Sequence, residues 1–193
     1  MEKEVRKIVE ERKLQHEQQN QQRKLTKDQQ KEKFVKKLKK DSSKESKICI
    51  FSVPNLFNHE IRHIINKNAK GLLLNGLCLI PTKFSNLGIP SIIVIEGGER
   101  AVKFFKRLLM VRIPNKLKRQ KKKGGKKESD SSSEQKNQEF ASLVWEGKII
   151  ESKLKKWVMA EITTPIEGKK MFQERGLEHY WPTAINFHQS KNN

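Results

Sequence analysis

The chain has 193 residues and a formal charge of +20, with 42 Lys and Arg against 22 Asp and Glu. Only 34% of the residues are hydrophobic, and no apolar run approaches the ~20 residues that a membrane-spanning helix needs. Two cysteines, Cys49 and Cys78, are too few for a disulfide framework or a four-ligand metal site, and they fit a reducing compartment. We therefore expect a nucleic acid as the partner, with no membrane and no small-molecule substrate.

Residues 1–46 predict a basic helical arm, because they lack Gly and Pro and are rich in helix formers. Apolar residues are sparse, so one long helix, or two, should bury little before ending near Asp41. Lysines recur at helical spacing in two stripes, which are Lys24, Lys27 and Lys31, and then Lys33, Lys36, Lys37 and Lys40. Such stripes can follow a phosphate backbone. Solvated pairs such as Glu32 with Lys36 are the alternative explanation.

Residues 47–189 predict an α+β domain. The expected elements are strand 48–53, a helix from the N-cap Asn58 to about Lys70, strands 72–80 and 91–95, a helix over 99–113, strands 143–150 and 156–163, and a helix over 165–175. This order contains the β-α-β-β-α-β frame of the ferredoxin-like fold, with one extra strand and helix. The aromatic segment 178–181 follows, and we expect Pro182 to end the pattern.

Residues 114–139 predict a linker that interrupts the domain. Eight of the twelve residues from Lys116 to Lys127 are basic, and an acidic serine run covers 128–134. No core can be drawn from this composition, so we expect disorder. The basic run is compatible with nucleic-acid binding and with a nuclear-import signal, and composition does not separate the two.

The segment 59–63 reads H-E-I-R-H, which matches the H-E-x-x-H pattern of zinc proteases. In that chemistry two imidazoles hold zinc, and the Glu polarises a bound water. However, His59 and His63 lie about 160° from Ile61 on the helical wheel, away from the apolar stripe. We therefore expect exposed histidines, no metal, no cofactor and no enzymatic activity. A zinc peptidase that uses His59, Glu60 and His63 is the alternative.

Four large aromatic side chains near the C-terminus could stack on unpaired bases, namely Trp145, Trp157, Tyr180 and Trp181. An aromatic residue in a strand is more often part of the core, and this is the favoured interpretation of Trp157. The group His179-Tyr180-Trp181 follows the end of a helix and is the better candidate for stacking.

Five short motifs occur in order between Arg23 and Trp181. They are R-K-L-T at 23–26 with K-E-K at 31–33 and K-K-L-K-K-D at 36–41, N-A at 68–69 with L-L-L-N-G at 72–76, E-G-G at 96–98 with K-F-F-K-R-L at 103–108, L-V-W-E-G at 143–147, and E-H-Y-W at 178–181. No single motif is specific, but in this order they resemble the spliceosomal pre-mRNA-processing factor 3 family of the U4/U6 small nuclear ribonucleoprotein.

The resemblance implies a nuclear, non-enzymatic splicing factor of the U4/U6 particle and the U4/U6.U5 tri-snRNP, with other proteins of these particles as partners. In this family a basic helix contacts the U4/U6 snRNA duplex, and the ferredoxin-like domain holds the adjoining single-stranded U6 3′ region. Carried onto the matching positions, the implied RNA-binding residues are Arg23, Lys24, Lys31, Lys33, Lys36, Lys37, Lys39, Lys40, Lys106, Arg107, His179 and Tyr180. A non-specific basic RNA-binding protein is the remaining alternative.

Overall fold

The computed structural model describes residues 2–54, 56–82, 89–123 and 140–192. Its elements are α1 (Glu2–Arg23), α2 (Lys27–Ser42), β1 (Ser46–Val53), α3 (His59–Gly71), β2 (Asn75–Pro81), β3 (Ser91–Gly98), α4 (Glu99–Arg107), η1 (Leu108–Arg112), α5 (Ile113–Lys123), β4 (Ser142–Ile149), β5 (Trp157–Ile162), α6 (Pro165–Gln173) and α7 (Tyr180–Asn192). The chain divides into two compact units, 1–37 and 38–193, so the last turn of α2 belongs to the second unit. No helix in the described ranges has the length and apolar character to cross a membrane.

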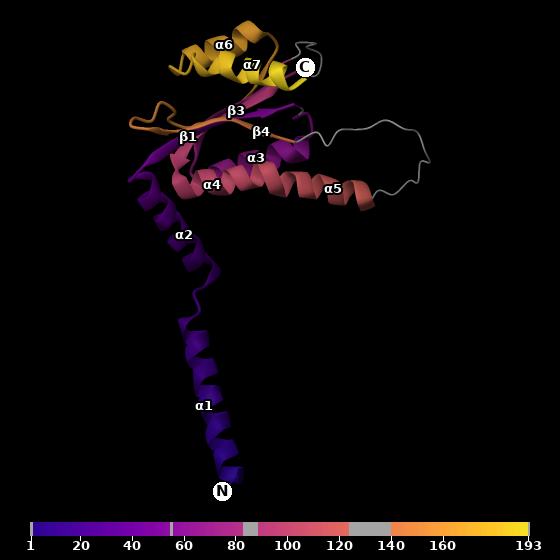
Figure 1. Ribbon diagram of the computed structural model, residues 1–193. Coiled ribbons are helices and arrows are strands. Elements are labelled where there is room, and N and C mark those ends of the chain that lie inside the picture. The colour runs from indigo at the N-terminus through magenta and orange to yellow at the C-terminus, as the bar shows by residue number, and fades with distance from the viewer. Residues whose placement is uncertain (1, 55, 83–88, 124–139, 193) are drawn as a thin grey trace. The chain divides into compact units, whose positions relative to one another are not determined.

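A five-stranded mixed sheet forms the centre of the second unit, in the order β4-β1-β3-β2-β5. Strand β1 pairs antiparallel with β3 and β4, and β2 pairs antiparallel with β3 but parallel with the edge strand β5. Helices α3, α4 and α5 cover one face of the sheet, and α6 and α7 cover the other (Figure 1). The expected α+β class and the helical N-terminal arm are confirmed.

Side chains that alternate along the strands feed two apolar cores. On β1, Cys49 and Phe51 join the core beneath α3 and α4, whereas Ile48 and Ile50 join the core beneath α6 and α7. The three inner strands are almost wholly buried because helices cover both faces of the sheet. Within the sheet, side chains that meet a ligand must therefore come from the edge strands.

Helix α3 forms where the isoleucine spacing predicts it. The side chain of Asn58 caps it by accepting a hydrogen bond of 2.9 Å from the amide of Glu60, and its inward face buries Ile61, Ile65 and Ala69. After the helix, Leu73 has a φ of 55°, in the left-handed region that Gly usually fills. This turn delays β2 to Asn75, three residues later than expected.

The helix expected over 99–113 is longer and contains a π-helical turn. Helix α4 passes through η1 directly into α5. Pro114 has no N–H to donate, and its ring crowds the preceding turn of an α-helix. The wider π-helical turn lies just before Pro114, which explains how the helix continues past a residue that usually ends one.

Helix α5 corrects the expectation that the whole of 114–139 is a disordered linker. Lysine is a good helix former, and Ile113 and Leu117 pack against the core beneath α3 and α4. Composition alone concealed this, because two apolar side chains among many lysines are enough to hold a short helix on a domain. Residues 124–139 of the expected linker lie outside the described residues.

The C-terminal helices show one expected start and one unexpected element. Helix α6 begins at Pro165, and Thr164 caps it by accepting a hydrogen bond of 3.2 Å from the amide of Glu167. We expected Pro182 to end the pattern, but α7 runs from Tyr180 to Asn192. Pro182 lies in the first turn of α7, where its missing N–H removes no hydrogen bond of the helix.

The last turn of α2 is packed into the second unit. Leu38 is only 3% exposed and belongs to the core beneath α3 and α4. Asp41 Oδ2 accepts a hydrogen bond of 2.7 Å from the backbone N–H of Arg100. Gly98, the N-cap of α4, makes no capping hydrogen bond of its own. Asp41 therefore caps α4 from a distant part of the sequence.

Candidate nucleic-acid interface

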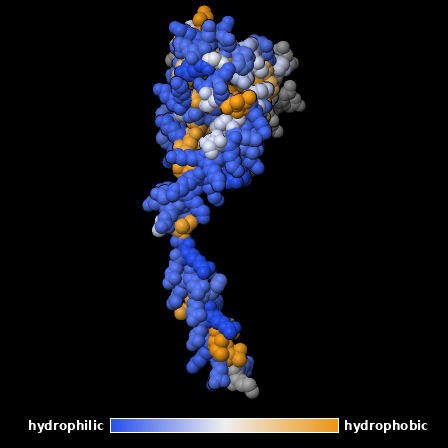
Figure 2. Space-filling view, turned by 90° about the vertical axis from the view of Figure 1, so that its left-hand side faces the viewer, coloured by the Kyte–Doolittle hydropathy of each residue, from blue (hydrophilic) through white to orange (hydrophobic). Residues whose placement is uncertain are grey.

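The basic residues predicted for duplex contact are all exposed, and Figure 2 shows a mainly hydrophilic surface along α1 and α2. They are Arg23, Lys24, Lys31, Lys33, Lys36, Lys37, Lys39 and Lys40. Two of them form exposed ion pairs, Lys31 with Asp28 at 3.4 Å and Lys36 with Glu32 at 4.0 Å. Exposed pairs of this kind contribute little, so a phosphate can replace the carboxylate at small cost.

A capping box separates the two helices of the arm. The amide of Gln29 donates to Thr26 Oγ1 at 3.3 Å, and the amide of Thr26 donates to Gln29 Oε1 at 3.0 Å. This reciprocal arrangement starts a new helix, which decides between the one helix and the two that the sequence allowed. The two helices also differ in net charge. Helix α1 has six basic and five acidic residues, whereas α2 has seven basic and three acidic ones. The excess positive charge therefore lies in α2.

Three rings form an aromatic cluster, defined here as Trp145 of β4 with His179 and Tyr180 at the start of α7. The ring of Tyr180 lies 5.2 Å from that of Trp145 and 3.9 Å from that of His179, between centroids. Trp145 is 38% exposed and His179 is exposed. The indole of Trp145 lies over Gly147, where a Cβ would overlap it. The L-V-W-E-G motif thus supplies both the ring and the space for it.

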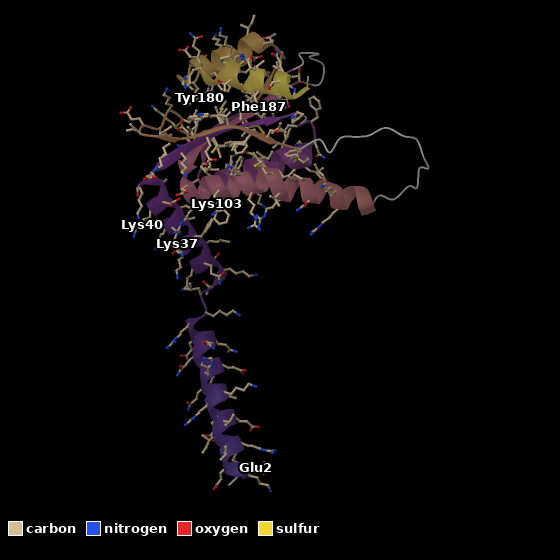
Figure 3. All side chains as sticks on the ribbon, in the orientation of Figure 1. Glu2, Lys37, Lys40, Lys103, Tyr180 and Phe187 are labelled. Carbon is tan, nitrogen blue, oxygen red and sulfur yellow. The ribbon has the colours of Figure 1, made fainter. Side chains whose placement is uncertain are left out.

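Tyr180 is the half-buried member of the aromatic cluster, on the first turn of α7 (Figure 3). Burial raises the pKa of its phenol, and the negative charge of Glu96 adds to this shift. Glu96 itself is 2% exposed and accepts hydrogen bonds from Ser152 Oγ at 2.7 Å and from the amide of Leu154 at 2.9 Å. Tyr180 therefore stays a neutral ring at physiological pH.

Trp181 is a correction to the predicted stacking group. It is 8% exposed, and its ring meets that of Phe172 edge-on at 5.4 Å between α6 and α7. It is a core residue that a base cannot reach. Trp157 packs into the core as favoured, with its indole N–H donating to Asn66 Oδ1 at 3.0 Å. Trp145 was among the four candidate aromatics but not among the predicted site residues, and its pairing with Tyr180 depends on the fold.

The two predicted cations of the domain do not join the aromatic cluster. Lys106 and Arg107 lie on α4, on the opposite face of the sheet from α7. Lys106 Nζ pairs with Glu146 Oε2 at 2.8 Å, and Arg107 is exposed. Trp145 and Glu146 are neighbours on the edge strand β4 and point to opposite faces. Lys106 and the pair of His179 and Tyr180 therefore flank this edge on its two sides.

The H-E-x-x-H segment does not assemble a zinc-protease centre. His59 and His63 are exposed, as expected. The carboxylate of Glu60 faces α5, where it lies 3.8 Å from Lys116 Nζ and 3.5 Å from Gln120 Nε2. Within the described ranges, no three His, Cys, Asp or Glu side chains gather closely enough to hold a metal ion. Glu60 thus has a structural partner rather than the position of a general base.

A family model and a curated relative point to the same family. The family model "Small nuclear ribonucleoprotein Prp3, C-terminal domain" matches residues 49–184. The protein "U4/U5/U6 small nuclear ribonucleoprotein prp3" of Schizosaccharomyces pombe is 31% identical over 98% of this chain, and "Protein RDM16" of Arabidopsis thaliana is 29% identical over 97%. The chain spans 35% and 23% of the lengths of these relatives. Among solved structures, the dark state of the BLUF protein BlrB has a TM-score of 0.41 and 14% identity, covering 75% of this chain and 93% of its own.

Proposed function

The chain belongs to the Prp3 C-terminal domain family of small nuclear ribonucleoproteins, and we propose that it acts as a nuclear, non-enzymatic splicing factor of the U4/U6 particle and the U4/U6.U5 tri-snRNP. The family match covers nearly the whole second unit. The name of the fission-yeast relative places that protein in a particle of the same kind. Other proteins of these particles are the proposed protein partners.

The proposed RNA partner is U4/U6 snRNA, with the duplex on the arm and the adjoining single-stranded U6 3′ region on the domain. Exposed lysines on α2 suit a duplex, because phosphate contacts fix a protein on nucleic acid without reading its bases. The second unit suits a single strand, because unpaired bases stack on exposed aromatic rings. The charge of α2 and the aromatic cluster support this division.

The proposed frame of the domain is the ferredoxin-like fold. The strand order β4-β1-β3-β2, with antiparallel pairing throughout, supports this assignment. In that frame, β5, α6 and α7 are additions. The additions matter for the proposed function because α7 begins with Tyr180 and His179 directly precedes it.

The observation that carries the proposal is the position of the aromatic cluster at the edge of the sheet. Trp145 and His179 leave ring surface open to solvent. On the other face of the sheet, Arg107 of α4 is exposed, and Lys106 of α4 pairs with Glu146 of the same edge strand. A single strand that passes around β4 can stack bases on one side and place phosphates on the other.

The test is binding at fixed salt to a blunt duplex RNA, a single strand, and a duplex with a 3′ single-stranded tail. We expect the tailed duplex to bind at least about tenfold more tightly, or ~1.4 kcal/mol. Tyr180→Ala should remove most of this preference and leave binding to the blunt duplex unchanged. Tyr180→Phe keeps the ring and should keep the preference.

Equal affinity for all three RNAs would refute the proposal and leave non-specific binding through charge as the explanation. An unchanged preference in Tyr180→Ala would move the single strand away from the aromatic cluster while the splicing role stood. Circular dichroism of each variant shows whether the fold is intact.

A further inference from the structure

Helices α4 and α5, with η1 between them, form one continuous helical run that concentrates positive charge. From Glu99 to Lys123 the chain has eleven basic residues and one acidic residue. The net charge of this run, +10, is half of the +20 of the whole chain. The opposite layer, from Pro165 to Asn192, has four basic and three acidic residues. The two segments lie on opposite faces of the sheet (Figure 1), so their positive charge is strongly uneven between those faces.

Helix α5 is a built part of the domain. Ile113 is 2% exposed, and Leu117 packs against the core beneath α3 and α4. Glu60 of α3 holds the next turn through Lys116 and Gln120. These contacts fix which face of α5 is turned to solvent. That face is a defined surface rather than a mobile basic tail.

Several cations of this face have no acidic partner in the part of the chain that the structure describes. Arg112, Lys118 and Arg119 are exposed and form no ion pair there. Lys118 and Arg119 each lie at least about 100° around α5 from both Ile113 and Leu117, the two residues that face the core, so both are on its solvent side. The 11 residues of α5 span about 16 Å, a length over which double-stranded DNA carries about nine phosphate charges on its two strands together.

An open hollow of about 460 Å³ lies beside this face, lined by His59, Glu60, His63, Ile64 and Lys116. Its acidic group is already matched by Lys116. The two exposed imidazoles can donate hydrogen bonds to phosphate oxygens. They extend the polar surface from α5 onto the first turns of α3.

We propose that α5 and the start of α3 form a second nucleic-acid-binding surface, which takes the phosphate backbone of double-stranded RNA. A duplex suits α5, because the helix presents cations and no aromatic residue, so its contacts go to the phosphate backbone that a duplex displays along its length. The alternative interpretation of this basic run is a nuclear-import signal. If such a signal had to become extended to enter the groove of its receptor, the packing of Ile113 and Leu117 would have to break. The inference shares RNA as partner with the proposed function but uses neither the arm nor the aromatic cluster.

The test compares two double variants of the full chain, each losing two positive charges. Lys118→Ala with Arg119→Ala changes the proposed surface. Lys169→Ala with Lys170→Ala changes two exposed lysines on α6, in the opposite layer. For each protein, the affinity for a blunt duplex RNA is measured at several salt concentrations, after circular dichroism has shown equal folding.

We expect the α5 variant to lower the slope of log affinity against log salt by about two, one for each lost phosphate contact. The α6 variant should leave the slope nearly unchanged. Equal changes in both variants, or no change in the α5 variant, would overturn the proposal. The proposal would also be overturned if the α5 variant lost binding to a nuclear-import receptor while its affinity for the duplex stayed unchanged. Preference for the tailed duplex is measured separately, so loss of that preference refutes the proposed function without touching this result.

Discussion

The contrast between Trp181 and Trp145 leads to a quantitative prediction, because one ring is core and the other is partly exposed. A tryptophan buries up to about 250 Å². Trp181 is 8% exposed and Trp145 is 38% exposed. The difference is about 75 Å² of buried surface, or about 2 kcal/mol at 25 cal/mol per Å². Trp181→Ala should cost ~3–5 kcal/mol, the range for a large aromatic residue in a core. Trp145→Ala should cost about 2 kcal/mol less.

The assay is urea unfolding followed by circular dichroism, with affinity for a single-stranded RNA as the second measurement. Trp145→Ala should lose affinity by about 1–3 kcal/mol, the value of one stacked base. Trp181→Phe fills part of the core site, stays folded if the alanine variant does not, and should keep its affinity. Equal losses of stability in the two alanine variants would refute this assignment of core and surface. So would a greater loss of RNA affinity in Trp181→Phe than in Trp145→Ala.

Three further predictions concern backbone strain and titration. Leu73→Gly should raise the free energy of unfolding by about 1 kcal/mol, because glycine adopts a positive φ without strain; a lower urea midpoint would contradict this. Tyr180 is the single tyrosine, and its raised pKa predicts an absorbance titration with a midpoint above 10. The folded state then holds the phenol proton of Tyr180 more tightly than the unfolded chain does. The protonated phenol therefore contributes fully to stability below the unfolded pKa, and this contribution is lost as the pH rises through the folded pKa. A midpoint at or below 10 would refute the burial of the phenol. Burial raises the pKa of Cys49 and Cys78 to about 12, so at pH 8 both thiols should react with a thiol reagent only as fast as the domain opens, and rapid labelling in the native state would contradict it.

Local signals predicted most of the elements, and long-range packing accounts for the elements that were missed. Helix α3 was predictable because its isoleucines repeat at helical spacing and Asn58 caps it. Helix α7 was missed because Pro182 ends a helix in its interior but is tolerated in its first turn. Helix α5 was missed because the packing of Leu117 and the pairing of Glu60 with Lys116 join segments far apart in the chain.

The candidate site divides in the same way. The exposure of the arm lysines followed from a composition that cannot bury a helix. Which aromatic residues remain exposed did not follow, because burial of Trp181 depends on the crossing of α6 and α7. The partnership of Trp145 with Tyr180 joins β4 to α7, which pattern alone could not pair. One local signal was available: Gly147 stands two residues after Trp145 and leaves space for its indole on the surface of the strand.

The capping of α4 by Asp41 has a consequence for how the protein can be taken apart. A truncation at the expected boundary after residue 46 would remove Leu38 from the core and leave the amide of Arg100 without its acceptor. Such a cut would cost ~2–5 kcal/mol for the leucine and ~1 kcal/mol for the cap. An autonomous fragment therefore has to start no later than Leu38, and it would retain Lys39 and Lys40. The boundary of folding thus lies inside the basic helix, and excision of the whole arm would destabilise the domain it was meant to isolate.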